Sequence, residues 1–597
     1  MVRTWTKQSE RFRKGVIQPI PEEIDHFEEE LKRFRRGEVD PLRFRSFRLQ
    51  QGTYGQRQPD VNMMRIKIPF GGLTADQLEA LGIIAEKYSW GKGHVTTRQN
   101  IQFHFMNLDN TPTVMRMLAE VGLTTREACG NTVRNITGCP LAGVCRSEAF
   151  DTSPYAAAFA RYFVRNPLSQ YLPRKFKPAF SGCESDCAIT PIHDIGFLAQ
   201  VQGVNGRVKK GFRMTVGGGL STMPRYADVL YDFVPVEDYL RVTEAVLRVF
   251  DRLGERKNRA KARIKFLVKK LGLEEFRRLV EEELQQPWAQ EPIELESLTD
   301  LEDESPPPTP RPAARAGRNG HRNGAGASAS AFERWKRTNV TPQKQPGYYA
   351  AHITLPLGDI LSHQFRGLAN MARKYHGGHA RTSIEQDLVM RFIPEGRLEE
   401  FYRDLAKLDL AADGAGTIMD VVSCPGATTC SLAITSSKDL GEVLTQEVRK
   451  LDFLDEELEA LTIKISGCPN GCGQHNLGSI GLQGASMNRN NRQVPAYDIF
   501  LGGAFYEKGA RIGERVGKVP AKRVPQAIAK VLKTYKKEKK AGESFPDFID
   551  RYGARNFQPL LEEFQEVAPL HKDIESYLDW GTKKVYKVER GEGECAA

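Results

Sequence analysis

The segment Ser466–Asn476, SGCPNGCGQHN, decides the fold, because it places Cys468 and Cys472 in a glycine-rich loop with three residues between them. Upstream, the segment SCPGATTC contains Cys424 and Cys430, with five residues between them. Four thiols in this C-x5-C, C-x3-C arrangement can hold a cubane iron–sulfur cluster, since Gly- and Pro-rich loops direct sulfurs and backbone N–H groups toward one centre. Structural zinc is the alternative. Zinc sites mostly use pairs two to four residues apart, so the wide first gap favours the cluster.

The same pattern occurs a second time, 285 residues earlier (424 − 139). The earlier quartet is Cys139, Cys145, Cys183 and Cys187. The single offset of 285 also pairs Gly93-His94 with Gly378-His379, and Gly217-Gly218 with Gly502-Gly503. Matches this dense indicate an internal repeat, so we expect one structural unit present in two copies.

Each copy is expected to begin with a small half-domain and to continue into a longer segment that holds its cysteines. The half-domains begin with the strand-like segments RIKIPF (Arg65–Phe70) and HITLPL (His352–Leu357), each followed by a helix with an apolar stripe. In the longer segments, strands such as DIGFLAQV (Asp194–Val201) and SIGLQGA (Ser479–Ala485) alternate with helices. Interleaved strands and helices predict a layered fold of the α/β (α+β) class.

The cysteine pattern resembles that of the sirohaem-dependent sulfite and nitrite reductases, and the resemblance extends from about Gln50 to about Ile549. It implies a [4Fe–4S] cluster on Cys424, Cys430, Cys468 and Cys472, with Cys472 also bridging to the iron of sirohaem. It further implies two ferredoxin-like half-domains and two cysteine-bearing α/β domains, arranged about a pseudo-twofold axis with the cofactors at the interface.

Four basic residues match those with which this family grips its anionic substrate. They are Arg98 in TTRQNIQFHF, Arg134 in NTVRNITGC, and Lys175 and Lys177 in LPRKFK. At the offset of 285 their counterparts are uncharged: Ser383, Met419, Ala460 and Thr462. We therefore expect one copy to supply the cluster and thiolate, and the other to supply a positive pocket that binds the anion and polarises its S–O or N–O bonds.

Five further residues near these motifs are candidates for contacts with the carboxylates or amides of the cofactor, and structural turns are the equal alternative: Arg126, Asn131, Gln99, Asn470 and Gln474. The first quartet, Cys139, Cys145, Cys183 and Cys187, is expected to bind a second cubane cluster, because it keeps every spacing of the second quartet, which the single-cluster members of the family lack in part or whole. The alternative is four reduced, buried thiols. A second sirohaem is disfavoured by the uncharged counterparts of the basic residues.

A chain of 597 residues exceeds the size of one hydrophobic core, so several domains are expected. Residues 306–331, rich in Pro, Gly, Ala and Ser, predict a disordered linker. The predicted divisions are an N-terminal extension (1–49), a first half-domain (50–125), a first cysteine-bearing domain (126–296), a linker (297–332), a second half-domain (333–408), a second cysteine-bearing domain (409–550) and a C-terminal segment (551–597).

No run of about 18 apolar residues predicts a membrane span, and the first residues lack the apolar core of a signal peptide. Ten cysteines, eight of them in paired motifs, favour a reducing compartment, so a soluble, cytoplasmic, monomeric protein is expected. The formal charge of +11 comes without a nucleic-acid-binding motif and suits an acidic partner. In the absence of flavin or nicotinamide motifs, we expect electrons to arrive from ferredoxin.

The predicted function is the six-electron reduction of sulfite to sulfide or of nitrite to ammonia at a sirohaem coupled to a [4Fe–4S] cluster. Two alternatives stay open at this point. One is a dissimilatory-like sulfite reductase subunit, and the other, from a different class, is a non-catalytic iron–sulfur or zinc protein.

Overall fold

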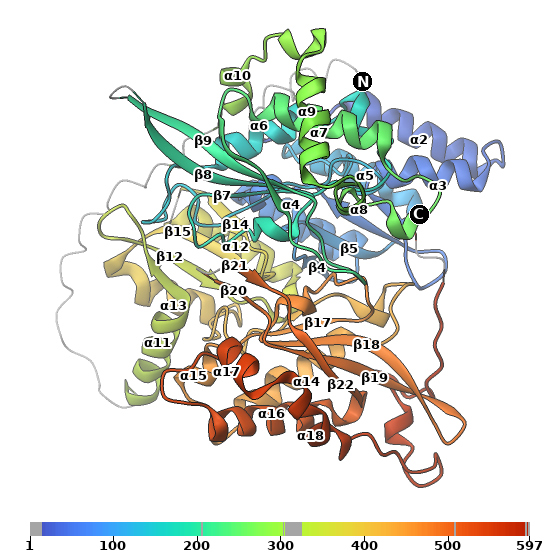
Figure 1. Ribbon diagram of the computed structural model, residues 1–597, viewed down its shortest axis with the longest axis vertical. Coiled ribbons are helices and arrows are strands. Elements are labelled where there is room, and N and C mark those ends of the chain that lie inside the picture. The colour runs from blue at the N-terminus through green and yellow to red at the C-terminus, as the bar shows by residue number, and fades with distance from the viewer. Residues whose placement is uncertain are drawn as a thin grey trace.

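The computed structural model describes residues 15–204, 207–301, 304, 325–375, 377–506, 509–591 and 594. Two cysteine-bearing domains form its upper and lower parts in Figure 1, and two half-domains lie between them. Before the first half-domain the chain forms α2 (Pro21–Arg35) and α3 (Pro41–Gln50).

The two half-domain sheets exchange one strand each. The first sheet has the order β1 (Thr53–Gly55), β2 (Asn62–Ile66), β5 (Ile101–Met106), β4 (Lys92–Val95) and β13 (Asp359–Leu361). The second has the order β11 (Val340–Pro342), β12 (Tyr348–Ile353), β15 (Leu388–Pro394), β14 (His379–Thr382) and β3 (Gly72–Thr74). Because β13 pairs with β4 and β3 pairs with β14, neither sheet is complete without the other copy.

The half-domain helices pack into one shared core, as their apolar stripes predict. Helix α4 (Ala75–Tyr88) begins at a capping box formed by Thr74 and Gln77. It packs against α12 (Ser362–Tyr375) of the other copy, and the rings of Phe103 and Phe365 lie 6.5 Å apart. Helices α5 (Thr111–Glu120) and α13 (Leu398–Ala406) contribute to the same core. The half-domains are therefore one hydrophobic unit built from both copies.

Each cysteine-bearing domain contains a five-stranded mixed sheet. The first has the order β10 (Asp228–Pro235), β9 (Arg207–Val216), β8 (Ile195–Val204), β7 (Pro178–Ser181) and β6 (Thr137–Gly138). The second has the order β16 (Val422–Ser423), β17 (Ile463–Ser466), β18 (Ile480–Arg489), β19 (Arg492–Leu501) and β22 (Glu514–Pro520). A separate hairpin joins β20 (Ala504–Tyr506) to β21 (Gly509–Arg511).

Helices complete these domains: α6 (Ser153–Phe163), α7 (Tyr239–Leu253), α8 (Ile264–Leu271), α9 (Leu273–Leu284) and α10 (Leu295–Thr299) in the first, and α14 (Ser437–Arg449), α15 (Glu456–Glu459), α16 (Val524–Glu538), α17 (Phe545–Tyr552) and α18 (Gln558–Glu562) in the second. The short strands β6 and β7 run parallel, as do β16 and β17. All four end immediately before or one residue before a predicted cysteine ligand. Parallel strands bring their carboxyl ends to one edge of a sheet, so the fold gathers the thiols of each quartet there.

The repeat is confirmed, but its predicted register is wrong in the half-domains. Three pairs of non-glycine residues with positive φ lie 287 residues apart: Phe70 and Leu357, Gln99 and Gln386, and Phe105 and Phe392. In the cysteine-bearing domains, Ile189 and Gln474 keep the spacing of 285. The second copy is two residues shorter where the two domains join, so no single offset can hold.

Two predicted pairings change with the register. Gly93-His94 corresponds to Ala380-Arg381, since β4 and β14 both begin 287 residues apart. The counterpart of Arg98 is Glu385 and not the uncharged Ser383. The counterparts of Arg134, Lys175 and Lys177 stand as predicted, because β6 and β16, like β7 and β17, start 285 residues apart.

The predicted linker is described only at its ends. Residues 305–324, which include most of the predicted disordered stretch, lie outside the described residues. Its last residues were also predicted to be disordered, but they form the start of helix α11 (Ala325–Asn339).

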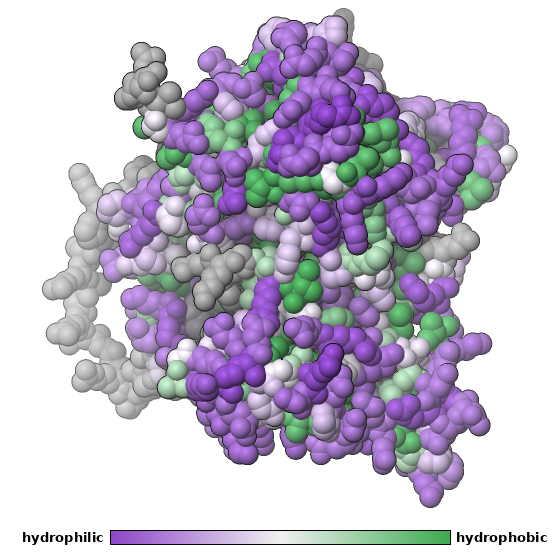
Figure 2. Space-filling view, in the orientation of Figure 1, coloured by the Kyte–Doolittle hydropathy of each residue, from purple (hydrophilic) through white to green (hydrophobic). Residues whose placement is uncertain are grey.

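Among the described residues, no helix combines the length and the apolar character that crossing a bilayer requires. On the face drawn in Figure 2, hydrophobic residues appear in scattered areas between hydrophilic ones.

Candidate active site

The second cysteine quartet lies on two loops that follow β16 and β17. The N–H of Cys424 donates to Ile465 O at 3.2 Å, which ties the first loop to the neighbouring strand. The N–H of Gly467 donates to Cys424 Sγ at 3.2 Å. Burial raises the pKa of the Cys468 thiol to about 12, and the neighbouring Cys472 and Cys424 thiols raise it further. The thiols are therefore close neighbours, and a backbone N–H already points at one sulfur, as iron–sulfur loops require.

This donor set fits a cluster better than a zinc ion. In the part of the chain that the structure describes, no three His, Cys, Asp or Glu side chains gather in a way that could hold a single metal ion. A four-iron cluster is larger than one ion, so its thiolate ligands stand further apart. The zinc alternative loses its structural support.

Cys472 is exposed, whereas Gln474, His475 and Asn476, which follow it, are buried. The hydroxyl of Thr97 donates to Cys472 O at 2.8 Å. Thr97 lies in the loop between β4 and β5 that also carries Arg98. This contact brings the basic loop of the first copy directly over the exposed thiol of the second.

Three of the four predicted basic residues converge beside that thiol. The pKa of Lys177 is well below its usual value, because the side chain is buried and because Arg263, Lys175 and Arg98 add positive charge nearby, while Cys472 acts in the opposite direction. Burial also lowers the pKa of Arg98 to about 9. The Arg98 guanidinium donates to Thr137 Oγ1 at 3.0 Å and to Pro178 O at 3.1 Å, so its position is fixed.

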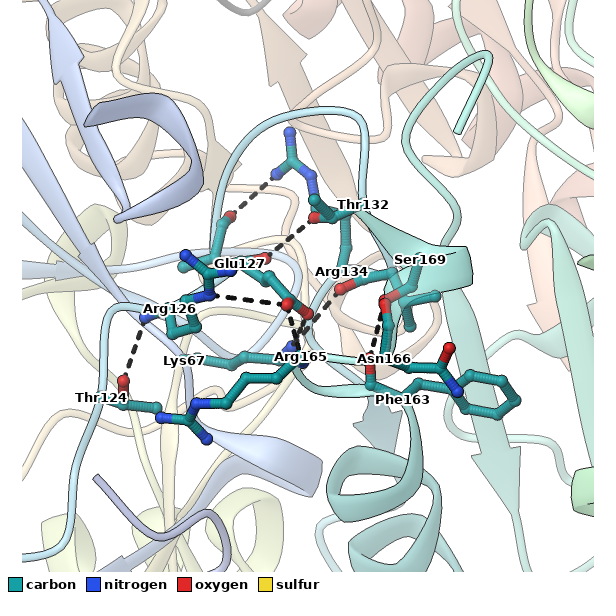
Figure 3. Close-up of polar contacts among 12 residues, drawn as sticks. Lys67, Thr124, Arg126, Glu127, Thr132, Arg134, Phe163, Arg165, Asn166 and Ser169 are labelled. Carbon is teal, nitrogen blue, oxygen red and sulfur yellow. Dashed lines mark hydrogen bonds and ion pairs between the residues drawn. The ribbon is translucent and has the colours of Figure 1, made fainter. Parts of the chain in front are cut away.

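Arg134 lies beside this cluster but uses its guanidinium within its own loop. It donates to Gly130 O and Ala128 O, both at 2.9 Å, and to Tyr54 Oη at 3.1 Å. Figure 3 shows the loop from Thr124 to Arg134, which is fastened by the buried Glu127. Arg134 is close enough to lower the pKa of Arg98, so it contributes positive charge to the cluster.

Arg126 belongs to a different group of charges, also drawn in Figure 3. Its Nη2 donates to Gln170 Oε1 at 2.7 Å, and its Nε lies 3.6 Å from Glu127 Oε1. The N–H of Arg165 donates to the same oxygen at 2.8 Å, and Lys67 Nζ lies 3.8 Å from Glu127 Oε2. Burial lowers the pKa of Lys67 to about 8. The role predicted for Arg126 toward a cofactor stays a prediction, and its observed role is to hold this loop.

The structure adds residues that the sequence did not single out. Arg263 donates to both carboxylate oxygens of Asp194 at 2.8 Å, and the N–H of Lys177 donates to Asp194 Oδ2 at 2.8 Å. Asp194 is fully buried and directly precedes β8. The polar residue at the start of the DIGFLAQV strand was the available signal for Asp194. Arg263 follows an irregular connection far along the chain, and no sequence pattern marks it.

His193 and Arg174 lie around the same cluster. The pKa of His193 is well below its usual value, because it is buried and next to Arg98. Burial, followed by Arg263 and Arg134, lowers the pKa of Arg174.

Gln99 and Gln474 are engaged with protein groups. Gln99 donates its amide to Gly138 O at 2.9 Å and to Thr382 O at 2.6 Å, and it accepts from the N–H of Gly138 at 2.8 Å. Its counterpart Gln386 likewise donates to Val95 O and accepts from the N–H of Ser423, both at 2.8 Å. These two glutamines clamp the copies together. Gln474 accepts from Lys464 Nζ at 3.0 Å, on the side of the second copy.

Asn470 and Asn131 differ in position. The exposed Asn470 donates its backbone N–H to the Cys468 thiol, so it lies in the cluster loop itself. Asn131 is half-buried at the edge of the loop in Figure 3, and its carbonyl accepts from the N–H of Leu172 at 3.0 Å. Neither arrangement tests the predicted contact with a cofactor.

The residues present fit the expected cofactors. Four neighbouring thiols provide a cluster ligand set, and the exposed Cys472 faces buried cations that can balance the peripheral carboxylates of sirohaem. When bound, sirohaem supplies the iron at which an anion is reduced, and the cluster supplies single electrons.

Comparison with known proteins gives the same result. The family model described as the nitrite and sulphite reductase 4Fe-4S domain matches residues 129–288 and 414–567, and the nitrite/sulfite reductase ferredoxin-like half domain matches residues 54–121 and 341–408. An assimilatory ferredoxin-dependent nitrite reductase of Haloferax mediterranei is 30% identical over 533 residues, which are 86% of this chain and 87% of that protein. A sulfite reductase [ferredoxin] 2 of Mycolicibacterium paratuberculosis is 30% identical over 493 residues, 82% of each chain.

Among solved structures, the Mycobacterium tuberculosis NirA protein matches with a TM-score of 0.73 and 26% identity, covering 87% of this chain and 92% of that one. The predicted family and the duplicated α/β fold are thereby confirmed. The chain belongs to the nitrite and sulphite reductase family, whose members carry sirohaem and a [4Fe–4S] cluster.

Proposed function

We propose that this protein catalyses the six-electron reduction of nitrite to ammonia or of sulfite to sulfide, with electrons from ferredoxin. The observation that carries the proposal is the convergence of Arg98, Lys175 and Lys177 of the first copy beside Cys472 of the second. An anion bound there lies between fixed positive charges and the thiol that the family uses to join its two cofactors.

The basic residues have distinct chemical roles. Arg98 is immobilised by its hydrogen bonds and presents a permanent positive charge, which stabilises negative charge developing on the oxygens of the anion. Lys177 Nζ gives up a proton more readily than an exposed lysine, because its pKa is lowered by burial and by neighbouring cations. It can therefore donate a proton to an oxygen that leaves as water and regain one from solvent.

The electron donor is inferred from the relatives and from charge. The Haloferax mediterranei and Mycolicibacterium paratuberculosis proteins are named as ferredoxin-dependent enzymes. The formal charge of +11 suits an acidic one-electron donor of that kind. A monomer in the cytoplasm is part of the same proposal, because thiols meant for clusters need a reducing compartment.

The test is a comparison of both substrates on one anaerobically purified preparation. Visible bands of sirohaem should be present, and reduced ferredoxin or a reduced viologen dye should support turnover of nitrite, sulfite or both. The ratio of the two kcat/KM values assigns the substrate. A preparation that carries sirohaem and reduces neither anion would contradict the proposal.

A further inference from the structure

The four cysteines of the first copy form a second set of neighbouring thiols. Cys139 forms a hydrogen bond with Cys187 and is close to Cys145, and Cys145 forms a hydrogen bond with Cys183. Cys139 and Cys183 are buried, and the other two are half-buried. Four cysteines separated by as many as 48 residues (187 − 139) therefore meet at one place.

The backbone holds this quartet as it holds the other. Cys139 donates its N–H to Phe180 O at 3.2 Å, the same distance as the equivalent bond from Cys424 to Ile465. The N–H of Cys145 donates to Leu141 O, and that of Cys430 donates to Gly426 O, both at 2.9 Å.

Each of these loops is also fastened by the half-domain of the opposite copy. The N–H of Lys344 donates to Val144 O at 2.9 Å, and the N–H of Arg57 donates to Thr429 O at 2.8 Å. The first quartet thus keeps the complete frame of a ligand site, which four unrelated buried thiols would not need.

The space beside this quartet differs from the active site in charge. Acidic residues replace the polar or basic ones there: Glu385 is the counterpart of Arg98, Asp387 of Asn100, and Asp420 of Asn135. Burial raises the pKa of Asp420 to about 6, and it raises that of Asp387 as well. Lys464 is the basic residue beside Asp420 and Glu385, and it is held by Gln474. An anionic substrate or the carboxylates of a sirohaem would be repelled here.

The equivalent of the contact between Thr97 and Cys472 is also altered. Ile384 is the counterpart of Thr97, and it packs with Ile189, Ile192 and Leu477 in a small apolar cluster. Ile189 is two residues from Cys187. The polar contact that borders the active site is thus replaced by packed hydrocarbon.

We propose that Cys139, Cys145, Cys183 and Cys187 bind a second [4Fe–4S] cluster that has no sirohaem beside it. The ligand frame of the active half is retained, whereas the cationic chamber that would receive a haem is absent. Such a cluster accepts one electron from a one-electron donor of the ferredoxin class and releases it again, so it stores charge without reducing an anion itself.

Metal and cofactor content of the anaerobically purified protein test this proposal. Two clusters and one sirohaem give about nine irons per chain, and a single-cluster enzyme gives about five. We expect about nine irons with one sirohaem, and a Cys183→Ala variant should lose about four irons while keeping its sirohaem absorption. The electron paramagnetic resonance signal of the reduced clusters should fall by about half in that variant.

Cys129→Ala is the matched control, since Cys129 is a buried cysteine of the same domain outside both quartets, and its iron content should not change. About five irons in the unmodified protein, zinc in place of the additional iron, or two sirohaems per chain would each overturn the proposal. The unmodified protein decides the question even where the variant does not fold. Because sirohaem and turnover are measured separately, an empty first quartet leaves the proposed reductase function intact.

Discussion

Thr97 donates its hydroxyl to the carbonyl oxygen of Cys472 at 2.8 Å, which joins the basic loop of one copy to the thiol loop of the other. The same two copies exchange strands β3 and β13 between their sheets. The active site therefore forms only where both copies meet. The duplication allows one copy to specialise in positive charge and the other in the exposed thiol.

The Thr97→Val substitution removes this one bond and keeps the shape of the side chain. One hydrogen bond contributes about 0.5–1.5 kcal/mol, so we expect turnover to fall by no more than about tenfold, with sirohaem content unchanged. Steady-state rates and the visible spectrum measure both. The control is Thr534→Val, which removes a similar bond on helix α16 far from the site. Equal rates for Thr97→Val and the unmodified protein would show that the contact does not position the site.

Lys177→Met removes the proton and the charge while keeping much of the length of the side chain. Loss of one such group from a pre-organised site lowers kcat by about 100-fold or more, and the thiols that hold the cofactors are untouched. We expect normal sirohaem absorption with slow turnover, and the same direction for Lys175→Met. Lys537→Met, at a strongly exposed lysine, serves as the control. Full activity in both active-site variants would place the anion pocket elsewhere.

Local patterns in the sequence were sufficient for the repeat, the class of fold, the apolar helix faces and the positions of both quartets. Arg98, Lys175 and Lys177 were also correctly placed together. The register of the half-domains was not, because the two-residue difference lies between conserved-looking segments and is visible only when the kinks at Gln99 and Gln386 are compared. The ion pair between Asp194 and Arg263 joins residues 69 apart, and such pairing depends on tertiary packing that no local pattern encodes.

Asp194→Asn tests the buried carboxylate of the cluster. Asp194 accepts from Arg263 and from the N–H of Lys177, so its charge partly balances Arg98, Arg263 and Lys177. Breaking a buried ion pair costs about 3–5 kcal/mol, and we expect a clear fall in thermal stability. The natural control is Ser479→Ala, because Ser479 is the counterpart of Asp194 and accepts from the N–H of Thr462 at 3.1 Å. That loss should cost about 1 kcal/mol. Similar effects of the two substitutions would show that the charge of Asp194 is not needed.

The last prediction concerns acid stability at the seam between the copies, where His94 on β4 meets Asp359 on β13. His94 Nδ1 lies 3.1 Å from Asp359 Oδ1, and its Nε2 lies 3.3 Å from the amide nitrogen of Gln386. The amide is a donor, so Nε2 must accept and the ring is neutral. Burial, followed by the nearby Lys438, lowers the pKa of His94 to about 4.

Protonation of His94 is easier in the unfolded chain, where the pKa of histidine is about 6.5. The unfolded state therefore binds more protons between about pH 4 and pH 6.5, and the folded state loses stability as the pH falls through that range. The contribution of this one ring is about 3 kcal/mol. We expect the melting temperature to fall less between pH 7 and pH 4.5 in His94→Gln than in the unmodified protein, whereas His363→Gln, at an exposed position, should keep the original dependence. Parallel curves for all three proteins would mean that another group governs the acid sensitivity of the seam.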